Sequence, residues 1–196
     1  MKPAMRHAGI LAPFLACMAS AVAAEPPPVE SFLLRSEAGW REIAATPPGA
    51  PRIAACDTQA EASFDIPLLA HAVAGDFIWL KLGDDGHARF TAALRERLAR
   101  DCARRRGPGT LTLLRTHQRA DGFSVTARLS VAETEERTLV WRLRPGGPWG
   151  WRASDVSADG VSLSSVLHEQ VRAAFDTAEG NAEAAIAGLA HGAPLP

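Results

Sequence analysis

The apolar and polar positions between residues 111 and 156 alternate with the two-residue period of half-buried β-strands. Phe123, Val125, Ala127, Leu129 and Val131 share one face of such a segment. A second segment repeats the pattern at 139–144, and turn-forming residues at 120–122, 133–136 and 145–148 separate the segments. The pattern predicts a four-stranded antiparallel meander formed by 111–116, 123–131, 139–144 and 149–156.

Helical spacing precedes these strands. Residues 29–45 predict a first helix that Pro47-Pro48-Gly49 ends, followed by a short loop. Asp65 is expected to cap a second helix that is apolar nearly all round, with a break at Gly75. Residues 84–106 predict an amphipathic helix that ends at Gly107-Pro108-Gly109. No span of a membrane is predicted in this part of the chain.

The segment 151–175 joins a strand to a helix through an acidic corner. Asp159-Gly160 predicts a turn, and Ser162 is placed to cap a helix whose apolar residues recur at three- and four-residue steps from Leu163. Helices, then strands, then a helix predict an α+β fold in which the four-stranded meander packs against N-terminal and C-terminal helices around an apolar cavity.

This corner resembles the MlaC or toluene-tolerance family of periplasmic phospholipid-transfer proteins. The family pattern W-x-x-x-D-V-x-x-x-G-V-S-L is matched by Trp151, Asp155, Val156, Gly160, Val161, Ser162 and Leu163. Where the family usually has tyrosine before Asp-Val and a Tyr-Arg pair in the helix, this chain has Ser154, Leu167 and His168, although Gln170 is kept. Residues 64–106 resemble the family's earlier helices, so the likeness covers roughly 64–190.

The resemblance implies a carrier that catalyses no reaction and encloses the acyl tails of a phospholipid or a similar apolar lipid. A hopanoid-associated or other apolar cargo is a related possibility. It would exchange this lipid between the outer-membrane lipid-extracting complex and the inner-membrane complex of a Mla-type ABC transport system. The expected lipid-binding residues combine one sheet face with neighbouring helices: Phe77, Phe90, Leu94, Leu98, Phe123, Val125, Leu129, Leu139, Trp141 and Leu143. Periodicity alone is equally compatible with a filled core formed by the same side chains.

The N-terminus has the composition of an export signal. A positively charged start and an apolar run end in small residues at 21–24, which predicts a cleavable signal peptide at 1–24 and one domain at 25–196. Cys17 leaves a lipoprotein signal as a minor alternative. Residues 25–196 contain 19 basic and 22 acidic side chains, a net charge of −3, which argues against nucleic acid as a partner.

Two cysteines remain after the signal, Cys56 in the expected loop and Cys102 on a helix. A disulfide and two separate thiols both fit the sequence, which cannot show how closely the two backbones approach. Pairing would tie the N-terminal segment to that helix.

No metal-binding, cofactor or catalytic motif stands out, because the histidines are scattered. Ser162 and Ser164 with His168 could form a nucleophile and base on one helix face, but serines near a helix start are more often caps or solvated, and no orienting partner is evident. Asp155 is the best polar candidate, either as a turn residue or as an inward-facing acid. Two alternatives to a carrier therefore remain: a small α+β enzyme of the nuclear-transport-factor-like kind, with Asp155 in an apolar pocket, and a structural adaptor without cargo.

Overall fold

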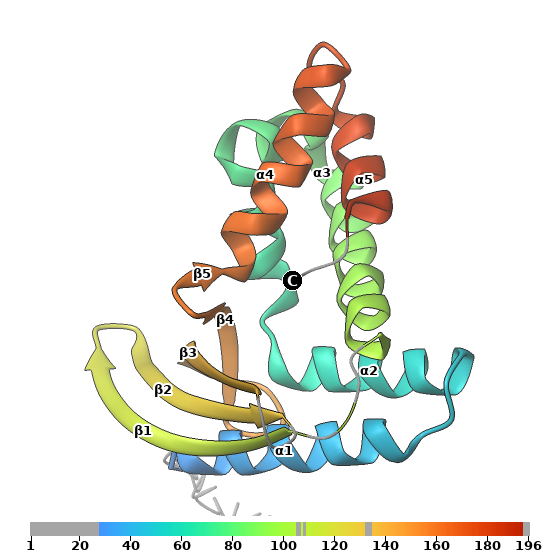
Figure 1. Ribbon diagram of the computed structural model, residues 1–196. Coiled ribbons are helices and arrows are strands. Elements are labelled where there is room, and N and C mark those ends of the chain that lie inside the picture. The colour runs from blue at the N-terminus through green and yellow to red at the C-terminus, as the bar shows by residue number, and fades with distance from the viewer. Residues whose placement is uncertain (1–27, 105–106, 108, 132–134, 194–196) are drawn as a thin grey trace, which may run out of the picture.

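The computed structural model describes residues 28–104, 107, 109–131 and 135–193, so the expected signal peptide and Cys17 lie outside the described residues. Figure 1 shows a sheet and an upright group of helices beside it. The elements in chain order are α1 (Glu30–Ala45), α2 (Ala50–Ser63), α3 (Ile66–Ala103), β1 (Gly109–Arg119), β2 (Gly122–Val131), β3 (Glu135–Pro145), β4 (Trp151–Ala158), β5 (Val161–Ser162), α4 (Leu163–Thr177) and α5 (Ala182–His191).

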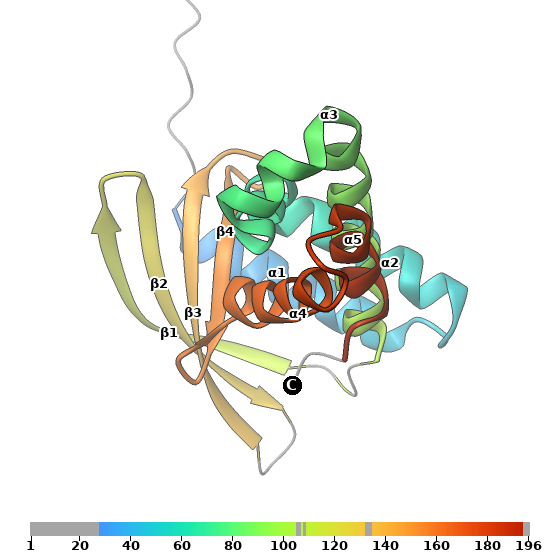
Figure 2. The same cartoon turned by 90° about the horizontal axis from the view of Figure 1, so that it is seen from above.

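The sheet follows chain order, β1-β2-β3-β4-β5, with each strand antiparallel to the next. The expected α+β fold and meander are confirmed. The fifth strand was not expected, since it contains two residues and pairs only with the end of β4. The sheet remains open, and α3, α4 and α5 lie to one side of it (Figure 2).

Two helices depart from the expected pattern. The loop predicted after Pro48 is wrong, because α2 begins at Ala50. Pro51 fits its first turn, where an amide would lack an intrahelical partner, and small residues continue the helix without a clear apolar stripe. The pattern also did not predict α5 as a separate helix, which Asn181 starts by accepting a hydrogen bond from the amide of Glu183.

The long helix α3 is interrupted twice. Gly75 and Gly83 have φ of 68° and 64°, a region that favours glycine, so the expected break at Gly75 is confirmed and a second one follows. By length and composition alone α3 could cross a membrane, which the sequence did not predict. Its most apolar stretch, 66–83, contains the Gly75 break, and residues such as Leu69 and Phe90 are fully buried against α4 and α5.

The buried apolar side chains form two main clusters. The helical core joins α3, α4 and α5 around Leu69, Phe90 and Leu167. The sheet core joins α1 to one sheet face around Phe32, Val125 and Trp141. Phe64, between α2 and α3, packs against both clusters. The carbonyl of Ala153 accepts a hydrogen bond from the next amide, Asp65, at 2.9 Å, which ties this junction to β4.

A third, small cluster contains a disulfide. Cys56 of α2 and Cys102 near the end of α3 are bonded, with Cα atoms 5.9 Å apart. The bond joins segments separated by 46 residues and fixes α2 against α3. Of the two states that the sequence allowed, the structure has the paired one. Cys56 lies in a helix rather than in the expected loop.

Candidate functional site

A pocket of about 600 Å³ lies between the helices and the apolar face of the sheet. Its apolar wall is formed by Trp40, Ile43, Ala44, Cys56, Ala60, Phe64, Leu98, Cys102, Leu129, Val131, Leu139, Trp141, Val156, Ala158, Val161, Leu163 and Val166. These residues come from α1, α2, α3, four strands and the start of α4, so the pocket touches both main cores. The volume is within the range of about 300–1,000 Å³ that is usual for small-molecule pockets.

Opposed strands build the sheet side of this pocket. Leu139 faces Ala158 and Trp141 faces Val156 in the β3–β4 register, and all four side chains line the pocket. A bulge between Arg142 and Leu143 shifts the register at this point. A bulge changes the direction in which the side chains on either side of it point. On one side of it Ala153 packs in the sheet core, and on the other Val156 and Ala158 point toward the pocket.

The ten residues expected to bind lipid separate into four groups. Leu98, Leu129, Leu139 and Trp141 line the pocket. Phe90 and Leu94 are buried in the helical core, whereas Phe123, Val125 and Leu143 belong to the sheet core. Phe77 is 65% exposed and lies in a smaller pocket of about 330 Å³ beside Gly75, His168 and Phe175. The structure thus brings together four of the ten.

Polar side chains occupy part of the lining: Gln59, Ser63, Asp101, Arg104, Arg137, Asp159 and Ser162. Asp159 accepts a hydrogen bond from the amide of Thr138 at 2.9 Å. The indole Nε1 of Trp141 is buried without a hydrogen-bond partner among the residues that the structure describes. A buried donor of this kind is costly unless it is satisfied; the ring of Trp141 contributes to the apolar wall of the pocket.

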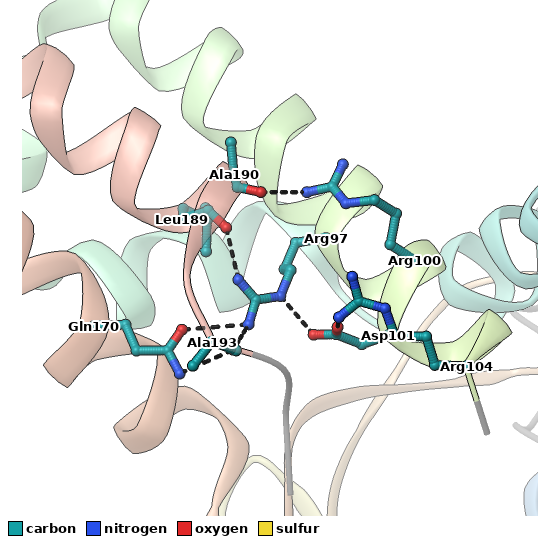
Figure 3. Close-up of polar contacts among 8 residues, drawn as sticks. All are labelled: Arg97, Arg100, Asp101, Arg104, Gln170, Leu189, Ala190 and Ala193. Atoms are coloured by element: carbon teal, nitrogen blue, oxygen red, sulfur yellow. Dashed lines mark hydrogen bonds and ion pairs between the residues drawn. The ribbon is translucent and has the colours of Figure 1, made fainter.

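A buried charge cluster centred on Arg97, which the sequence pattern did not predict, lies beside the pocket (Figure 3). The side chain of Arg97 is 2% exposed and pairs with Asp101, which lines the pocket. Its guanidinium also donates to the carbonyl of Leu189 at 2.9 Å, to that of Ala193, and to Gln170. The spacing of Arg97 and Asp101, four residues apart on a helix, was the available signal, but such pairs are common on solvated faces.

Two further arginines hold helices to α3. Arg95 donates to Asp57 and Glu61 of α2, and hydrogen bonding to Asp57 is the main cause that raises the pKa of Arg95. Arg89 forms a two-pronged contact with Glu183 of α5, with both N–O distances at 2.6 Å. That contact lowers the pKa of Glu183 and raises the pKa of Arg89. These contacts therefore hold α2 and α5 against α3.

Asp155 lies at the expected corner and is buried, with 7% of its surface exposed. One carboxylate oxygen accepts from the hydroxyl of Ser162 at 2.7 Å and the other from the amide of Ser164 at 3.1 Å. Ser162 also caps α4 by accepting from the amide of Ser165, as expected. Both carboxylate oxygens thus stabilise the start of α4, and Asp155 does not line the pocket.

The described residues contain no group of three histidine, cysteine, aspartate or glutamate side chains that could hold a metal ion. His168, the histidine nearest in sequence to Ser162 and Ser164, has its Nδ1 2.9 Å from the carbonyl of Val73. The pocket offers a mostly apolar lining with several polar groups, which suits binding of an apolar molecule that carries a polar end.

Comparison with known proteins assigns this fold. The family model of the MlaC protein matches residues 45–191. The chain belongs to the MlaC family. The resemblance drawn from the Trp151–Leu163 pattern is confirmed, and the match begins earlier than the expected residue 64, so it includes α2.

A solved structure supports the fold independently. It is the phospholipid-binding protein from Ralstonia solanacearum in complex with a phospholipid, 18% identical, with a TM-score of 0.61. The alignment covers 82% of this chain and 92% of that one. No curated protein matches the chain. At this identity the likeness establishes a shared MlaC fold.

Proposed function

We propose that this MlaC-family chain is a periplasmic carrier that binds phospholipid tails in the pocket of about 600 Å³ between the helices and the sheet. The observation that carries the proposal is this apolar pocket within a fold whose structural relative is a phospholipid complex. Of the expected residues, Leu98, Leu129, Leu139 and Trp141 are the proposed tail contacts.

Burial of methylene groups supplies the affinity in this proposal. Each methylene removed from water contributes about 0.8 kcal/mol, so a sixteen-carbon tail gains roughly 12 kcal/mol before the costs of ordering the lipid. No reactive group is needed, and the chain is proposed not to be an enzyme. The alternative enzyme was expected to place Asp155 in the pocket, whereas Asp155 is used at the start of α4. The two acids that line the pocket are also engaged, Asp101 by Arg97 and Arg104 and Asp159 by the amide of Thr138.

The proposed partners follow from the family. The chain would receive or deliver phospholipid at an outer-membrane lipid-extracting complex and at the inner-membrane complex of a Mla-type ABC transport system. Its export would depend on the expected signal peptide at 1–24. An adaptor without cargo is disfavoured by the pocket, since a filled interior would serve that role equally well.

The test is to purify the protein without residues 1–24 and to identify co-purifying lipids by mass spectrometry. The carrier should retain phospholipid, or take it up from vesicles after delipidation. In Ala158→Trp, an indole on the pocket wall should lower the lipid content severalfold. Ala187→Trp, on an exposed position of α5, is the matched control and should keep the wild-type content. A wild-type protein that is free of lipid and takes up none would contradict the proposal.

A further inference from the structure

The side of the sheet that faces away from the sheet core carries a band of arginines. In the strand register, Arg115, His117 and Arg119 of β1 lie opposite Thr126, Ser124 and Gly122 of β2. Arg142 of β3 lies opposite Ser124 on the other side of β2. Residues that face each other across strands point to the same side of a sheet, so these side chains share one surface. We call Arg115, Arg119, Arg128, Arg142 and Arg144 the arginine face.

This surface is open. Arg115, Arg128 and Arg142 are exposed, and the side chains of Arg119 and Arg144 are 46% and 43% exposed. Their neighbours on the inner side, Val125, Trp141 and Leu143, are buried in the sheet core. The helices α3, α4 and α5 stand beside the sheet (Figure 2).

The positive charge of the arginine face is only partly neutralised. Asp121 lies 3.6 Å from Arg119 and 4.0 Å from Arg144, and Glu136 lies 3.7 Å from Arg128. The guanidinium groups of Arg115 and Arg142 have no hydrogen bond or ion pair with any residue that the structure describes. The five arginines therefore lie near two exposed carboxylates, in a chain whose formal net charge is −1. Asp155 lies opposite Arg142 in the β3–β4 register, but it is buried and accepts hydrogen bonds at the start of α4.

The arginines of this face also flank a row of small residues. Gly122, Ser124 and Thr126 form a row of small side chains on β2, with arginines on β1 and β3 to either side. Strands two positions apart are about 9.6 Å from each other, so phosphate groups could sit between the two arginine rows. Interfaces between proteins usually contain aromatic or long apolar anchors, and this row offers none.

We infer that the arginine face docks the protein onto the surface of an anionic phospholipid bilayer. Guanidinium groups bind phosphate oxygens well, and a basic surface is drawn to anionic lipid by electrostatics that do not require a defined partner site. The inference goes beyond cargo binding, because this surface is opposite to the sheet side that lines the pocket. On the proposed function, it would bring the carrier to the surface of a membrane that holds one of its partner complexes.

The test measures co-sedimentation of the protein with two kinds of vesicle, one of equimolar phosphatidylglycerol and phosphatidylcholine and one of phosphatidylcholine alone. At low ionic strength we expect binding to the anionic vesicles only. At about 1 M salt, where the screening length is about 3 Å, binding should be lost. Equal binding to both vesicles would overturn the inference.

Arg115→Gln with Arg142→Gln should weaken binding to the anionic vesicles about 30-fold, since each arginine near such a surface contributes about fivefold. The matched control, Arg35→Gln with Arg172→Gln, makes the same change of net charge on α1 and α4 and should bind nearly as wild type. An equal loss in both double variants would show that net charge alone is responsible, which contradicts the inference. If wild-type protein does not bind the anionic vesicles, the inference is also contradicted, and an acidic protein becomes the candidate occupant of the arginine face.

Lipid content measured on the same samples separates this inference from the carrier proposal. The Arg115/Arg142 variant should keep its cargo, because neither side chain lines the pocket. If wild-type protein holds no lipid, the carrier proposal is contradicted, whereas docking onto vesicles can still be measured.

Discussion

Arg97 shows how a single residue can hold distant parts of this molecule together. Its guanidinium is buried against Asp101 on the same helix and against backbone carbonyls at Leu189 and Ala193, more than ninety residues later. A buried charge is tolerated only when its hydrogen bonds are satisfied, and removal of one partner leaves the other uncompensated. Arg97 should therefore be far less tolerant of substitution than the exposed arginines.

Arg97→Met is expected to lower the free energy of unfolding by about 3–5 kcal/mol, because Asp101 would remain buried without its main partner. Urea denaturation followed by circular dichroism measures the change. Arg104→Met is the matched control: it also contacts Asp101 but is 58% exposed, so its loss should cost about 1 kcal/mol or less. Equal effects of the two substitutions would show that burial does not set the importance of Arg97.

Substitution of Asp155 distinguishes a role in stability from a role in lipid binding. Asp155→Ala removes the acceptor for Ser162 and for the amide of Ser164, so we expect a loss of about 1–2 kcal/mol in the free energy of unfolding. Lipid content should stay at the wild-type level, because Asp155 does not line the pocket. Loss of bound lipid from a variant that remains folded would instead place Asp155 in the binding site.

At the scale of elements, the disulfide and the helices that it joins form one wall of the pocket. Cys56 and Cys102 both line it, as do Ala60 of α2 and Leu98 of α3. The bond therefore limits how far α2 can move away from α3. Arg95 reinforces the same pair of helices through Asp57 and Glu61.

The double variant Cys56→Ser with Cys102→Ser should be less stable by up to about 4 kcal/mol, the chain-entropy value for a loop closed across 46 residues. Chemical denaturation with and without a reducing agent measures this. Wild type in reductant should show the same loss, whereas the double variant should not respond to reductant. A double variant as stable as oxidised wild type would show that the helices hold without the bond.

The elements also differ in how well their sequence predicts them. Along β2, β3 and β4 one face is buried, so apolar and polar residues alternate and most of the meander can be predicted. β1 is exposed from Leu114 onward, and its alternation ends there. In α2 the buried residues are Cys56, Ala60 and Ser63, which give no strong apolar stripe, and its helix was mistaken for a loop. The brief pairing of β5 depends on the turn at Asp159-Gly160 rather than on any pattern of its own.

The residues that line the pocket could not be predicted from the sequence. Phe90 and Leu94 are apolar residues on the same helix as Leu98, yet they fill the helical core while Leu98 borders the pocket. Which apolar residue meets another and which meets open space depends on how the helices are placed against the sheet. The role of Arg97 depended in the same way on carbonyls far away in the chain.

At the scale of the whole molecule, the pocket connects the two main cores. Side chains of the helical core and of the sheet core both border it. A ligand in the pocket would thus add contacts to both cores, and a ligand that binds only the folded state stabilises that state as a whole.

Delipidated protein should consequently melt at a lower temperature than lipid-loaded protein. Lipid at a thousand times its dissociation constant stabilises the folded state by about 4 kcal/mol, which corresponds to roughly 8–16 °C for a domain of 150–250 residues. Differential scanning calorimetry of the two forms measures the shift. In Ala158→Trp the shift should be much smaller, and an unchanged shift would place the lipid outside this pocket.

The Arg97 cluster has a consequence for folding after export. In a chain that is delivered N-terminus first, α3 arrives some ninety residues before the carbonyls of Leu189 and Ala193. Until those residues arrive, the guanidinium of Arg97 lacks the two carbonyls, whereas the sheet is formed entirely by segments that precede α5. A chain truncated before Leu189 should therefore form the sheet while its helical core stays accessible to proteases.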